Sequence, residues 1–362
     1  MTGDVRSGIG DELKALRGPA RSVLATRTYR RRYLVIPAVV LGLFISLSFS
    51  LAIGSRSIVT GPDTRGYVQA YEGYVSCSCD APLLEVEPGF TLLTKTLAVL
   101  GLTALGYLTV IALIQIAGWI LALRFTFLPC VNHESKIAFF TLSTSLCLLS
   151  PFFYASTLNV LRTGIAVPLV MLGMGFAQKH RPIHAGVVWA LATAIQLPTA
   201  LSVVAAYLVF SRASVRMCLW TISLLALAYG LAISLFVVQA TVGNWGDLGA
   251  MLQVGDGTRY RSGVRLDFLA AGVFAFSFLA WLTRRNVRHV HIVRMLSSLL
   301  APFLLVGWTD FSDRWLLSFW LVAPFLLAVG VSDRLQPRAV WVAGVTLVPF
   351  AALTFVSRVG LI

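Results

Sequence analysis

The sequence predicts an all-α fold, a polytopic transmembrane helical bundle of about 10 to 12 spans that includes one pair of half-spans. Hydrophobic residues make up 57% of the 362-residue chain and charged residues only 12%, whereas soluble proteins average about 25% charged residues. Several stretches run for roughly 16 to 24 residues with little or no charge, the length that crosses a hydrocarbon core of about 30 Å. We therefore expect a multi-pass membrane protein.

The amino-terminal segment 1–32 is polar and basic, with eight Lys or Arg residues against three acidic ones. The apolar run 33–54 follows without a small-residue cleavage site, so it is interpreted as an uncleaved first span rather than a signal peptide. We expect 1–32 to be a cytoplasmic tail and 33–362 to form a single transmembrane domain. The net charge of +14 is better explained by basic loops on one side of a membrane than by nucleic-acid binding.

The remaining apolar runs define the later spans. They lie at 101–123, 137–154, 163–178, 185–196, 199–210, 217–240, 268–283, 295–308, 316–331 and 339–357. The stretch 185–210 is either one span or two half-spans broken at Gln196-Leu197-Pro198, because proline removes a helix hydrogen bond.

The distribution of basic residues decides between these two alternatives. With the amino terminus inside and a broken pair at 185–210, 20 of the 29 Lys and Arg residues fall on the cytoplasmic side. The cytoplasmic segments are then 1–32, 124–136, 179–184, 211–216, 284–294 and 332–338. A single span would move the arginines of 284–294 outside, against the positive-inside rule. The broken pair is preferred, and it predicts a cavity open to the outside, because a helix broken at membrane depth needs protein or a cavity around it.

The same topology places four segments on the outer face. They are the two large external loops, 55–100 and 241–267, and the shorter segments 155–162 and 309–315. These segments contain ten of the fifteen acidic residues and several arginines that run against the positive-inside bias. The sequence offers no hydrophilic domain large enough to fold alone, so we expect any chemistry at the outer membrane–water boundary.

Two carboxylates of the first external loop are candidate general bases. Asp63 and Tyr67 lie four residues apart, and Glu87 opens the sequence EPGF ahead of a short amphipathic run. These residues fit a solvated loop followed by an interfacial helix. They also fit the mouth of a cavity, where burial raises the pKa of a carboxyl group and suits it to proton abstraction.

Asn159 and Arg162 lie between two apolar runs, in the sequence STLNVLRTGIA. Residues three apart share one face of a helix. The arginine could simply extend from the end of a span toward water. Burying an unpaired arginine in the apolar phase, however, costs about 2.5–3.5 kcal/mol on insertion scales, and its planar fork matches phosphate. We therefore predict that Arg162 binds an anion.

Two further external segments carry arginines close to the start of a span. Arg259, Arg265 and Asp267 belong to the sequence GDGTRYRSGVRLDFL, whose glycines indicate a shaped loop. Arg314 follows Asp313 at the start of a later span. Arg265 and Asp267 could simply pair with each other. The repetition of arginines and carboxylates on one face instead favours a shared site for an anionic, lipid-linked substrate.

Several motifs occur in order over about residues 55 to 330. They are PD-x3-Y (Asp63, Tyr67), EPGF (Glu87 to Phe90), N-x2-R-x3-A (Asn159, Arg162, Ala166), G-x-R-x-D-F (Gly263, Arg265, Asp267, Phe268) and D-R-x5-W-x3-P (Asp313, Arg314, Trp320, Pro324). Together they resemble the EpsG family, Wzy-like integral membrane proteins of bacterial exopolysaccharide and O-antigen synthesis. Gln196 stands where members of that family often carry a histidine, and its amide can still hydrogen-bond a sugar.

The resemblance implies a GT-C/Wzy-like fold and a glycosyltransferase that polymerises undecaprenyl-pyrophosphate-linked oligosaccharide repeat units at the periplasmic face of the bacterial inner membrane. One lipid-linked glycan is the donor and leaves as lipid pyrophosphate, while the other supplies the acceptor hydroxyl. On this basis we expect pyrophosphate to be bound by four arginines, Arg162, Arg265, Arg314 and Arg259. Asp63 or Glu87 would be the general base, and Asp267 would orient Arg265. Sugar or phosphate oxygens would be contacted by Tyr67, Asn159 and Gln196.

Two other functions stay open. A GT-C glycosyltransferase that adds single sugars from a polyprenyl-phosphate carrier usually shows acidic pairs in its first external loop, often with a bound metal, whereas the acidic residues here are spread out. A flippase or exporter of lipid-linked glycan would place charges along a path through the membrane and often has repeated halves. No internal repeat is visible in the sequence.

The expected partners are the undecaprenyl-pyrophosphate-linked oligosaccharide, membrane lipid, a chain-length regulator and a flippase, and nucleic acid is not among them. Cys77 and Cys79 form a CSC pair, which by itself is weak support for either a metal site or a disulfide. The five cysteines show no metal-ligand spacing, and we expect neither a metal nor another cofactor.

Overall fold

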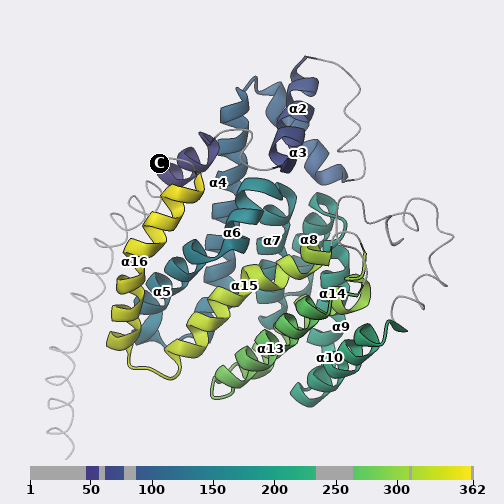
Figure 1. Cartoon of the computed structure of the whole chain (residues 1–362), viewed down its shortest axis with the longest axis vertical. Coiled ribbons are helices and arrows are strands. Elements are labelled where there is room, and N and C mark those ends of the chain that lie inside the picture. Colours follow the sequence, from purple (N-terminus) through teal and green to yellow (C-terminus); the bar gives the residue numbers. More distant parts are fainter. Residues whose placement is uncertain (1–45, 57–61, 77–86, 234–263, 310–311, 360–362) are drawn as a thin grey trace, which may run out of the picture. The chain divides into compact units, whose positions relative to one another are not determined.

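A computed structural model describes residues 46–56, 62–76, 87–233, 264–309 and 312–359 (Figure 1). The regular elements in these ranges are helices, with no strand among them, so the all-α prediction is confirmed. The chain divides into two units, Met1–Leu51 and Ala52–Ile362; residues 46–54 are helical, and the helices named next belong to the second unit. They are α2 (Pro62–Val75), α3 (Pro88–Val99), α4 (Ala104–Ala122), α5 (Lys136–Leu149), α6 (Pro151–Tyr154), α7 (Leu161–Gln178), α8 (Pro182–Ile195), α9 (Thr199–Arg212), α10 (Val215–Gly230), α13 (Leu266–Leu282), α14 (His289–Val306), α15 (Ser312–Ser332) and α16 (Pro337–Val359), with π-helical turns η2 (Leu123–Phe127) and η5 (Ala155–Asn159) and 3-10 turns η3 (Leu128–Cys130) and η4 (His133–Ser135).

Several of these helices can cross a membrane, which makes the chain a multi-pass membrane protein. Within the described residues, the helices of sufficient length and apolar character are Ala104–Cys130, Leu161–Gln178, His289–Val306, Arg314–Ser332 and Pro337–Val359. Helices α8, α9, α10 and α13 are apolar but shorter. At a rise of about 1.5 Å per residue they fall short of a 30 Å core when upright. Fewer helices reach full length than the sequence suggested, and the run 33–54 lies mostly outside the described residues.

The run predicted as one span at 137–154 is bent. Helix α5 ends at Leu149, and the next helical segment, Pro151–Asn159, departs from it by 71°. Ser150 is extended, and Pro151 occupies the first position of α6. Proline has no N–H to continue the ladder of α5 but is favoured at a helix start. The chain therefore turns at this point, and the pair counts as at most one span.

The predicted break between 185 and 210 is confirmed. Helix α8 ends at Ile195, Gln196 is extended, and α9 begins at Thr199 directly after Pro198. The Thr199 hydroxyl lies 2.7 Å from the Gln196 carbonyl oxygen and 3.1 Å from that of Ala192. Both carbonyls also accept backbone N–H groups, Ala192 from Gln196 at 3.0 Å and Gln196 from Thr199 at 3.1 Å, so the hydroxyl adds a second hydrogen bond to each oxygen at the break.

The described parts of the first external loop are largely helical, where the sequence suggested a solvated loop. Its polar sequence at 62–75 forms α2, while α3 occupies the predicted amphipathic run. The reason is aromatic packing on one side of α2. The Tyr71 ring stacks on Tyr107 of α4 with 4.4 Å between centroids, and Tyr67 packs edge-on against Phe90 of α3 at 5.5 Å. A polar helix is thereby fixed by its buried tyrosines.

The main core surrounds α7, α14 and α15, whose side chains are largely buried. Aromatic stacking connects α15 to its neighbours: Trp119 of α4 lies 4.9 Å from the Phe325 ring, and Trp320 lies 5.3 Å from the ring of Phe152. Helix α7 lies between α4 and α8 in Figure 1 and contacts both. This packing fixes the helix ends that carry the charged residues.

Polar contacts bring together segments that the charge distribution assigned to the cytoplasmic side. The Asn286 amide donates to the Cys130 carbonyl at 2.8 Å and to the Asp333 carboxylate at 2.6 Å. Arg294 Nε donates to the Ala213 carbonyl at 2.8 Å. These contacts agree with the expected grouping of the segments, while the side of the membrane that they face stays a prediction.

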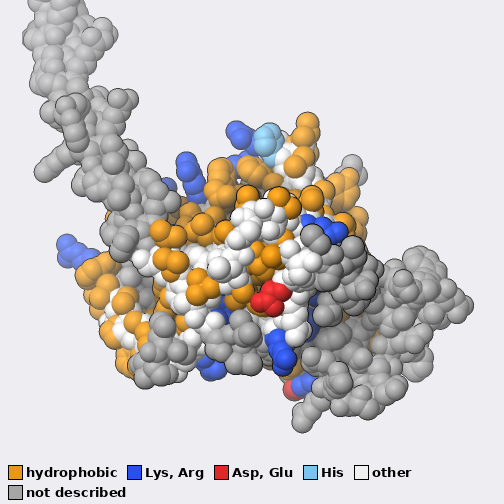
Figure 2. Space-filling model, turned by 90° about the horizontal axis from the view of Figure 1, so that it is seen from above, with side chains coloured by type: hydrophobic (Ala, Val, Ile, Leu, Met, Phe, Trp, Pro, Cys, Tyr) orange, Lys and Arg blue, Asp and Glu red, His pale blue; other side chains and the backbone are white. Residues whose placement is uncertain are grey.

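Apolar side chains dominate the face seen from above in Figure 2, where basic side chains lie mostly toward the edges and acidic ones are few. Large hydrophobic residues are also exposed along several helices, including Trp220 of α10, Phe274 of α13 and Leu353 of α16. Exposed apolar area on this scale is unusual for a water-soluble protein. Helices that face lipid expose apolar side chains of this kind.

Candidate functional site

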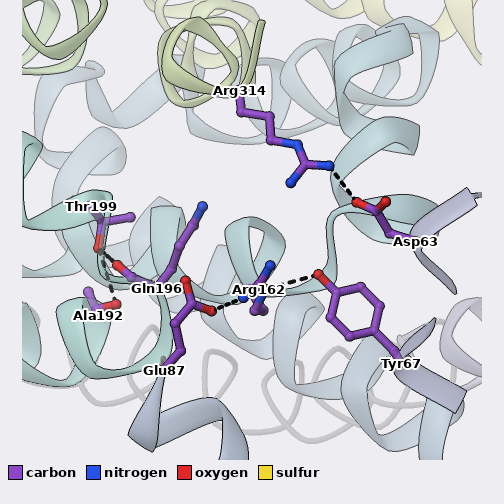
Figure 3. A network of polar contacts seen from close by, with 8 residues as sticks. All are labelled: Asp63, Tyr67, Glu87, Arg162, Ala192, Gln196, Thr199 and Arg314. Carbon is purple, nitrogen blue, oxygen red and sulfur yellow. Dashed lines mark hydrogen bonds and ion pairs between the residues drawn. The ribbon is translucent and has the colours of Figure 1, made fainter. Parts of the chain in front are cut away.

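Arg162, the second residue of α7, lies between Glu87 and Tyr67 (Figure 3). Its Nη1 donates to Oε2 of Glu87, and its Nε donates to the Tyr67 hydroxyl at 3.0 Å. The guanidinium also lies 5.7 Å from the centroid of the Tyr67 ring. The Arg162 side chain keeps 23% of its surface exposed and that of Glu87 only 7%. Arg162 is thus paired, which lowers the cost of placing its charge close to an apolar phase, and it stays accessible.

A second arginine, Arg314, reaches the same network from α15. Its Nη2 donates to Oδ2 of Asp63 at 2.8 Å, and the Asp63 backbone N–H donates to Oδ1 of Asn159 at 2.8 Å. Asp63 and Tyr67 are one turn apart on α2 and therefore share a face. Helix α2 consequently links the start of α7 to the start of α15, which brings two arginines from distant parts of the sequence into one site.

The sequence EPGF explains how Glu87 reaches Arg162. Glu87 immediately precedes α3, and Pro88 occupies the first helical position, where proline is favoured. A Cβ on Gly89 would lie 2.7 Å from the carbonyl carbon of Ala194, so only glycine allows α3 to approach the end of α8 this closely. Phe90 is fully buried against Tyr67. Each residue of the motif thus positions the Glu87 carboxylate.

Burial and charge act on Glu87 in opposite directions. Desolvation raises the pKa of Glu87, while Arg162 and the backbone amide of Leu197 lower it, and burial has the larger effect. Burial also raises the pKa of Tyr67, so its hydroxyl stays protonated at neutral pH and can donate a hydrogen bond. A carboxylate whose pKa is moved toward neutrality beside an arginine is a candidate general base.

The backbone just before Arg162 forms the π-helical turn η5, which side chains that the sequence analysis did not single out hold in place. Gln115 Nε2 of α4 donates to the Leu161 carbonyl at 3.0 Å and to that of Ser156 at 3.4 Å. A Cβ on Gly164 would lie 2.5 Å from the same Gln115 nitrogen. A glutamine in the middle of an apolar helix and a glycine in another apolar helix were the available signals for this packing.

Two more residues that the sequence analysis missed bind the same turn. Arg56 and Thr64 both donate to the carbonyl oxygen of Leu158. Arg56 lies two residues after the first apolar run, 33–54, and this position beyond the end of a predicted span was the only local signal. The turn that carries Asn159 and leads into Arg162 is therefore held from two sides.

Gln196 lies beside Glu87 in Figure 3, at the break between α8 and α9. Its side chain is buried, and its Oε1 has no hydrogen-bond partner among the described residues. Leaving a buried amide oxygen without a hydrogen-bond partner costs desolvation free energy. Gln196 can therefore contribute hydrogen bonds to a polar ligand in this site.

Arg265 and Asp267, predicted for the same site, form a pair of their own. Arg265 Nε donates to Oδ1 of Asp267 at 2.9 Å and Nη2 to Oδ2 at 2.6 Å. The Asp267 side chain is 60% exposed, and the Arg265 guanidinium lies 4.1 Å from the centroid of the Phe268 ring. Neither residue belongs to the network of Figure 3. The contact is the simple ion pair that the sequence left open for these residues.

Other predicted features lie outside the described residues, namely Arg259, Cys77 and Cys79. Within the described ranges, no group of three or more His, Cys, Asp or Glu side chains is gathered in a way that could hold a metal ion. The polar network itself offers two arginine forks, two carboxylates, a phenol and two amides. Such a set can bind an anion bidentately while a carboxylate accepts a proton.

No curated protein and no solved structure matches the chain. The model of the EpsG family matches residues 39–359, a range that includes all five motifs and the whole polar network. The chain belongs to the EpsG family.

Proposed function

We propose that this protein is a glycosyltransferase that polymerises oligosaccharide repeat units carried on a polyprenyl pyrophosphate. Membership of the EpsG family indicates a polysaccharide polymerase-like function. The observation that carries the finer proposal is the convergence of Arg162 and Arg314, each beside a carboxylate, at the starts of two apolar helices. A lipid-linked pyrophosphate presents its charge at this depth, where a helix end meets the membrane boundary.

The two arginines are suited to the pyrophosphate of the donor. Each guanidinium offers a planar set of N–H donors that matches phosphate oxygens. When the sugar–pyrophosphate bond breaks, negative charge develops on the departing phosphate oxygen. Preorganised donors aimed at that oxygen lower the barrier more than they strengthen donor binding. Arg162 and Arg314 would thus act chiefly as leaving-group stabilisers, with Asp63 orienting Arg314.

Glu87 is the proposed general base, because it is the more buried of the two carboxylates and burial raises its pKa. It would take the proton of the acceptor hydroxyl while that oxygen bonds to the anomeric carbon of the donor. The bond between the anomeric carbon and the pyrophosphate oxygen breaks, and its electron pair leaves with the pyrophosphate. Tyr67, Asn159 and Gln196 line the same network and would hydrogen-bond sugar or phosphate oxygens.

The proposed setting is the periplasmic face of a bacterial inner membrane, with the amino terminus in the cytoplasm. The basic segments expected on the cytoplasmic side support this orientation. The substrate would be an undecaprenyl-pyrophosphate-linked oligosaccharide that a flippase delivers, and a chain-length regulator would limit the product. Arg265, Asp267 and Arg259 would contact the glycan or a second pyrophosphate from the other large external loop.

The proposal predicts that Arg162→Ala and Arg314→Ala abolish long polymer in cells at equal expression, with single lipid-linked repeat units accumulating. Loss of one donor to a developing oxyanion costs about 10²–10³ in rate. Arg162→Lys should recover only part of the activity, because an ammonium cannot form the bidentate contact. Arg65→Ala, which removes an exposed arginine of α2, is the control. Full-length polymer from both alanine variants would overturn the pyrophosphate assignment.

A further inference from the structure

Arg56 is a buried arginine whose charge is balanced by no carboxylate among the described residues. Only 5% of its surface is exposed. Its Nη1 donates to the Ile53 carbonyl at 2.7 Å, and its Nη2 donates to the Leu158 carbonyl at 2.9 Å and lies 3.4 Å from the Thr64 hydroxyl. Its Nε is buried and has no hydrogen-bond partner among the residues that the structure describes. Burying a guanidinium against neutral carbonyls is expensive, so a purely structural donor would be a costly choice here.

The Leu158 carbonyl, which accepts a hydrogen bond from Arg56, lies close in the sequence to residues of the candidate site. Leu158 belongs to the π-helical turn η5, where Val160 N–H bonds to the Ala155 carbonyl at 2.8 Å. Such wide turns interrupt the regular ladder and occur frequently at functional sites. Two side-chain donors, Arg56 and Thr64, converge on this single carbonyl. The next residue is Asn159, which ends η5, and Arg162 is the second residue of α7 after the non-helical Val160.

Thr64 connects the same carbonyl to α2. It is the neighbour of Asp63, whose backbone N–H binds Asn159 and whose carboxylate binds Arg314. It also precedes Tyr67, which binds Arg162, by one turn. The hydrogen bonds of Arg56 and Thr64 to the Leu158 carbonyl therefore attach the turn before α7 to α2. A shift of this carbonyl would move the Asp63–Asn159 contact and the Tyr67–Arg162 contact.

We propose that Arg56 is a positioning residue for the pyrophosphate site, which sets the placement of Asn159 and Arg162 through the Leu158 carbonyl. This inference rests on the proposed function, because it concerns the geometry of that same site. Arg56 acts through the backbone and does not touch the substrate. A displacement of about 1 Å in a catalytic group can cost 10²-fold in rate. We therefore expect the contacts of Arg56 and Thr64 with Leu158 to affect the rate as well as the stability of the fold.

The test compares Arg56→Met and Arg56→Lys in the purified full-length protein, with farnesyl pyrophosphate as the binding probe and polymer length in cells as the second readout. Arg56→Met should weaken probe binding about tenfold or more and shorten the polymer, even among molecules that remain folded by size exclusion and thermal unfolding. Arg56→Lys should recover part of both, since an ammonium can still donate to Leu158. Thr64→Val should act in the same direction and Thr64→Ser should resemble the unchanged protein, because only serine keeps the hydroxyl. Arg65→Met is the control for loss of a nearby exposed positive charge.

A folded Arg56→Met protein with unchanged probe affinity and normal polymer would overturn the positioning role, even if its melting temperature were lower. Arg162→Ala and Arg314→Ala in the same assays separate the two proposals. If they leave probe binding and polymer unchanged, the pyrophosphate site itself is wrong. If they abolish both while Arg56→Met does not, only the role of Arg56 fails.

Discussion

At the scale of single residues, the two arginines of the site are occupied by carboxylates of the same chain. Arg162 is bound by Glu87 and Arg314 by Asp63. A carboxylate and a phosphate compete for the same face of a guanidinium. A pyrophosphate that binds Arg162 would therefore displace Glu87, and the released carboxylate would be available to the acceptor hydroxyl. Donor binding and activation of the base would then be linked through one side chain.

This competition leads to a prediction for Glu87→Gln. The amide keeps the shape of the side chain but loses its negative charge, so polymerisation should fall by about 10²–10⁴, the usual contribution of a general base. Binding of farnesyl pyrophosphate should become tighter, because no carboxylate competes for Arg162. Glu72→Gln, which alters an exposed carboxylate of α2, is the matched control for both measurements.

The pH dependence checks the same assignment. A base works only when deprotonated, and burial raises the pKa of Glu87 above its ordinary value of 4.5. Polymerisation should therefore decline on acidification before that value is reached. If the rate stayed constant down to pH 4.5, or if Glu87→Gln bound the probe more weakly, the proposed role of Glu87 would be wrong.

At the scale of elements, the short helices α2 and α3 deliver the carboxylates, while the long helices α7 and α15 supply the arginines. The approach of α3 to the end of α8 depends on Gly89, since an added Cβ would lie 2.7 Å from the backbone of Ala194. Backbone atoms cannot rotate away as a flexible side chain can. The position of Glu87 is thus set by how closely α3 can approach its neighbour.

Gly89→Ala is accordingly expected to separate α3 from α8, with a cost of about 1–3 kcal/mol for overpacking and loss of the Glu87–Arg162 contact. The melting temperature and polymer length should both fall. Gly186→Ala is a matched control on α8, where an added Cβ meets no atom within 4 Å, and alanine is the better helix former there. Equal behaviour of the two variants would show that the close approach is not required.

At the scale of the whole molecule, polar contacts join the loops in two sets. One set includes the site, and the other includes the contacts of Asn286 with Cys130 and Asp333. The charge distribution predicts that these sets lie on opposite sides of the membrane. Single cysteines at exposed Glu72 and at Val287, which is 96% exposed, test this in an otherwise cysteine-free protein. An impermeant maleimide added to intact spheroplasts should label position 72 alone, and labelling of both positions would contradict the predicted topology.

Features of the fold and the site could be predicted from the sequence where they depend on residues that are close together in the chain. The break at Gln196-Leu197-Pro198 was predictable, because proline acts on its own helix. The Arg265–Asp267 pair was foreseen as an alternative, because the two residues are neighbours in the sequence. Helix α2 was not recognised, because its polar composition hides a helix that is fixed by two buried tyrosines. The role of Arg56 gave almost no signal, because its partner Leu158 lies 102 residues away.

The sequence by itself determined the class of this protein, an all-helical multi-pass membrane protein, because hydropathy and span length are sums over consecutive residues. It also showed which charged residues lie next to apolar runs, where placing a charge costs free energy. Only the tertiary structure decided that Arg162 pairs with Glu87, 75 residues away, and Arg314 with Asp63, 251 residues away. The physical reason is that these pairs depend on which helix ends meet. That choice follows from the packing of whole helices, such as α2 against α3 and α4, and no local pattern records it.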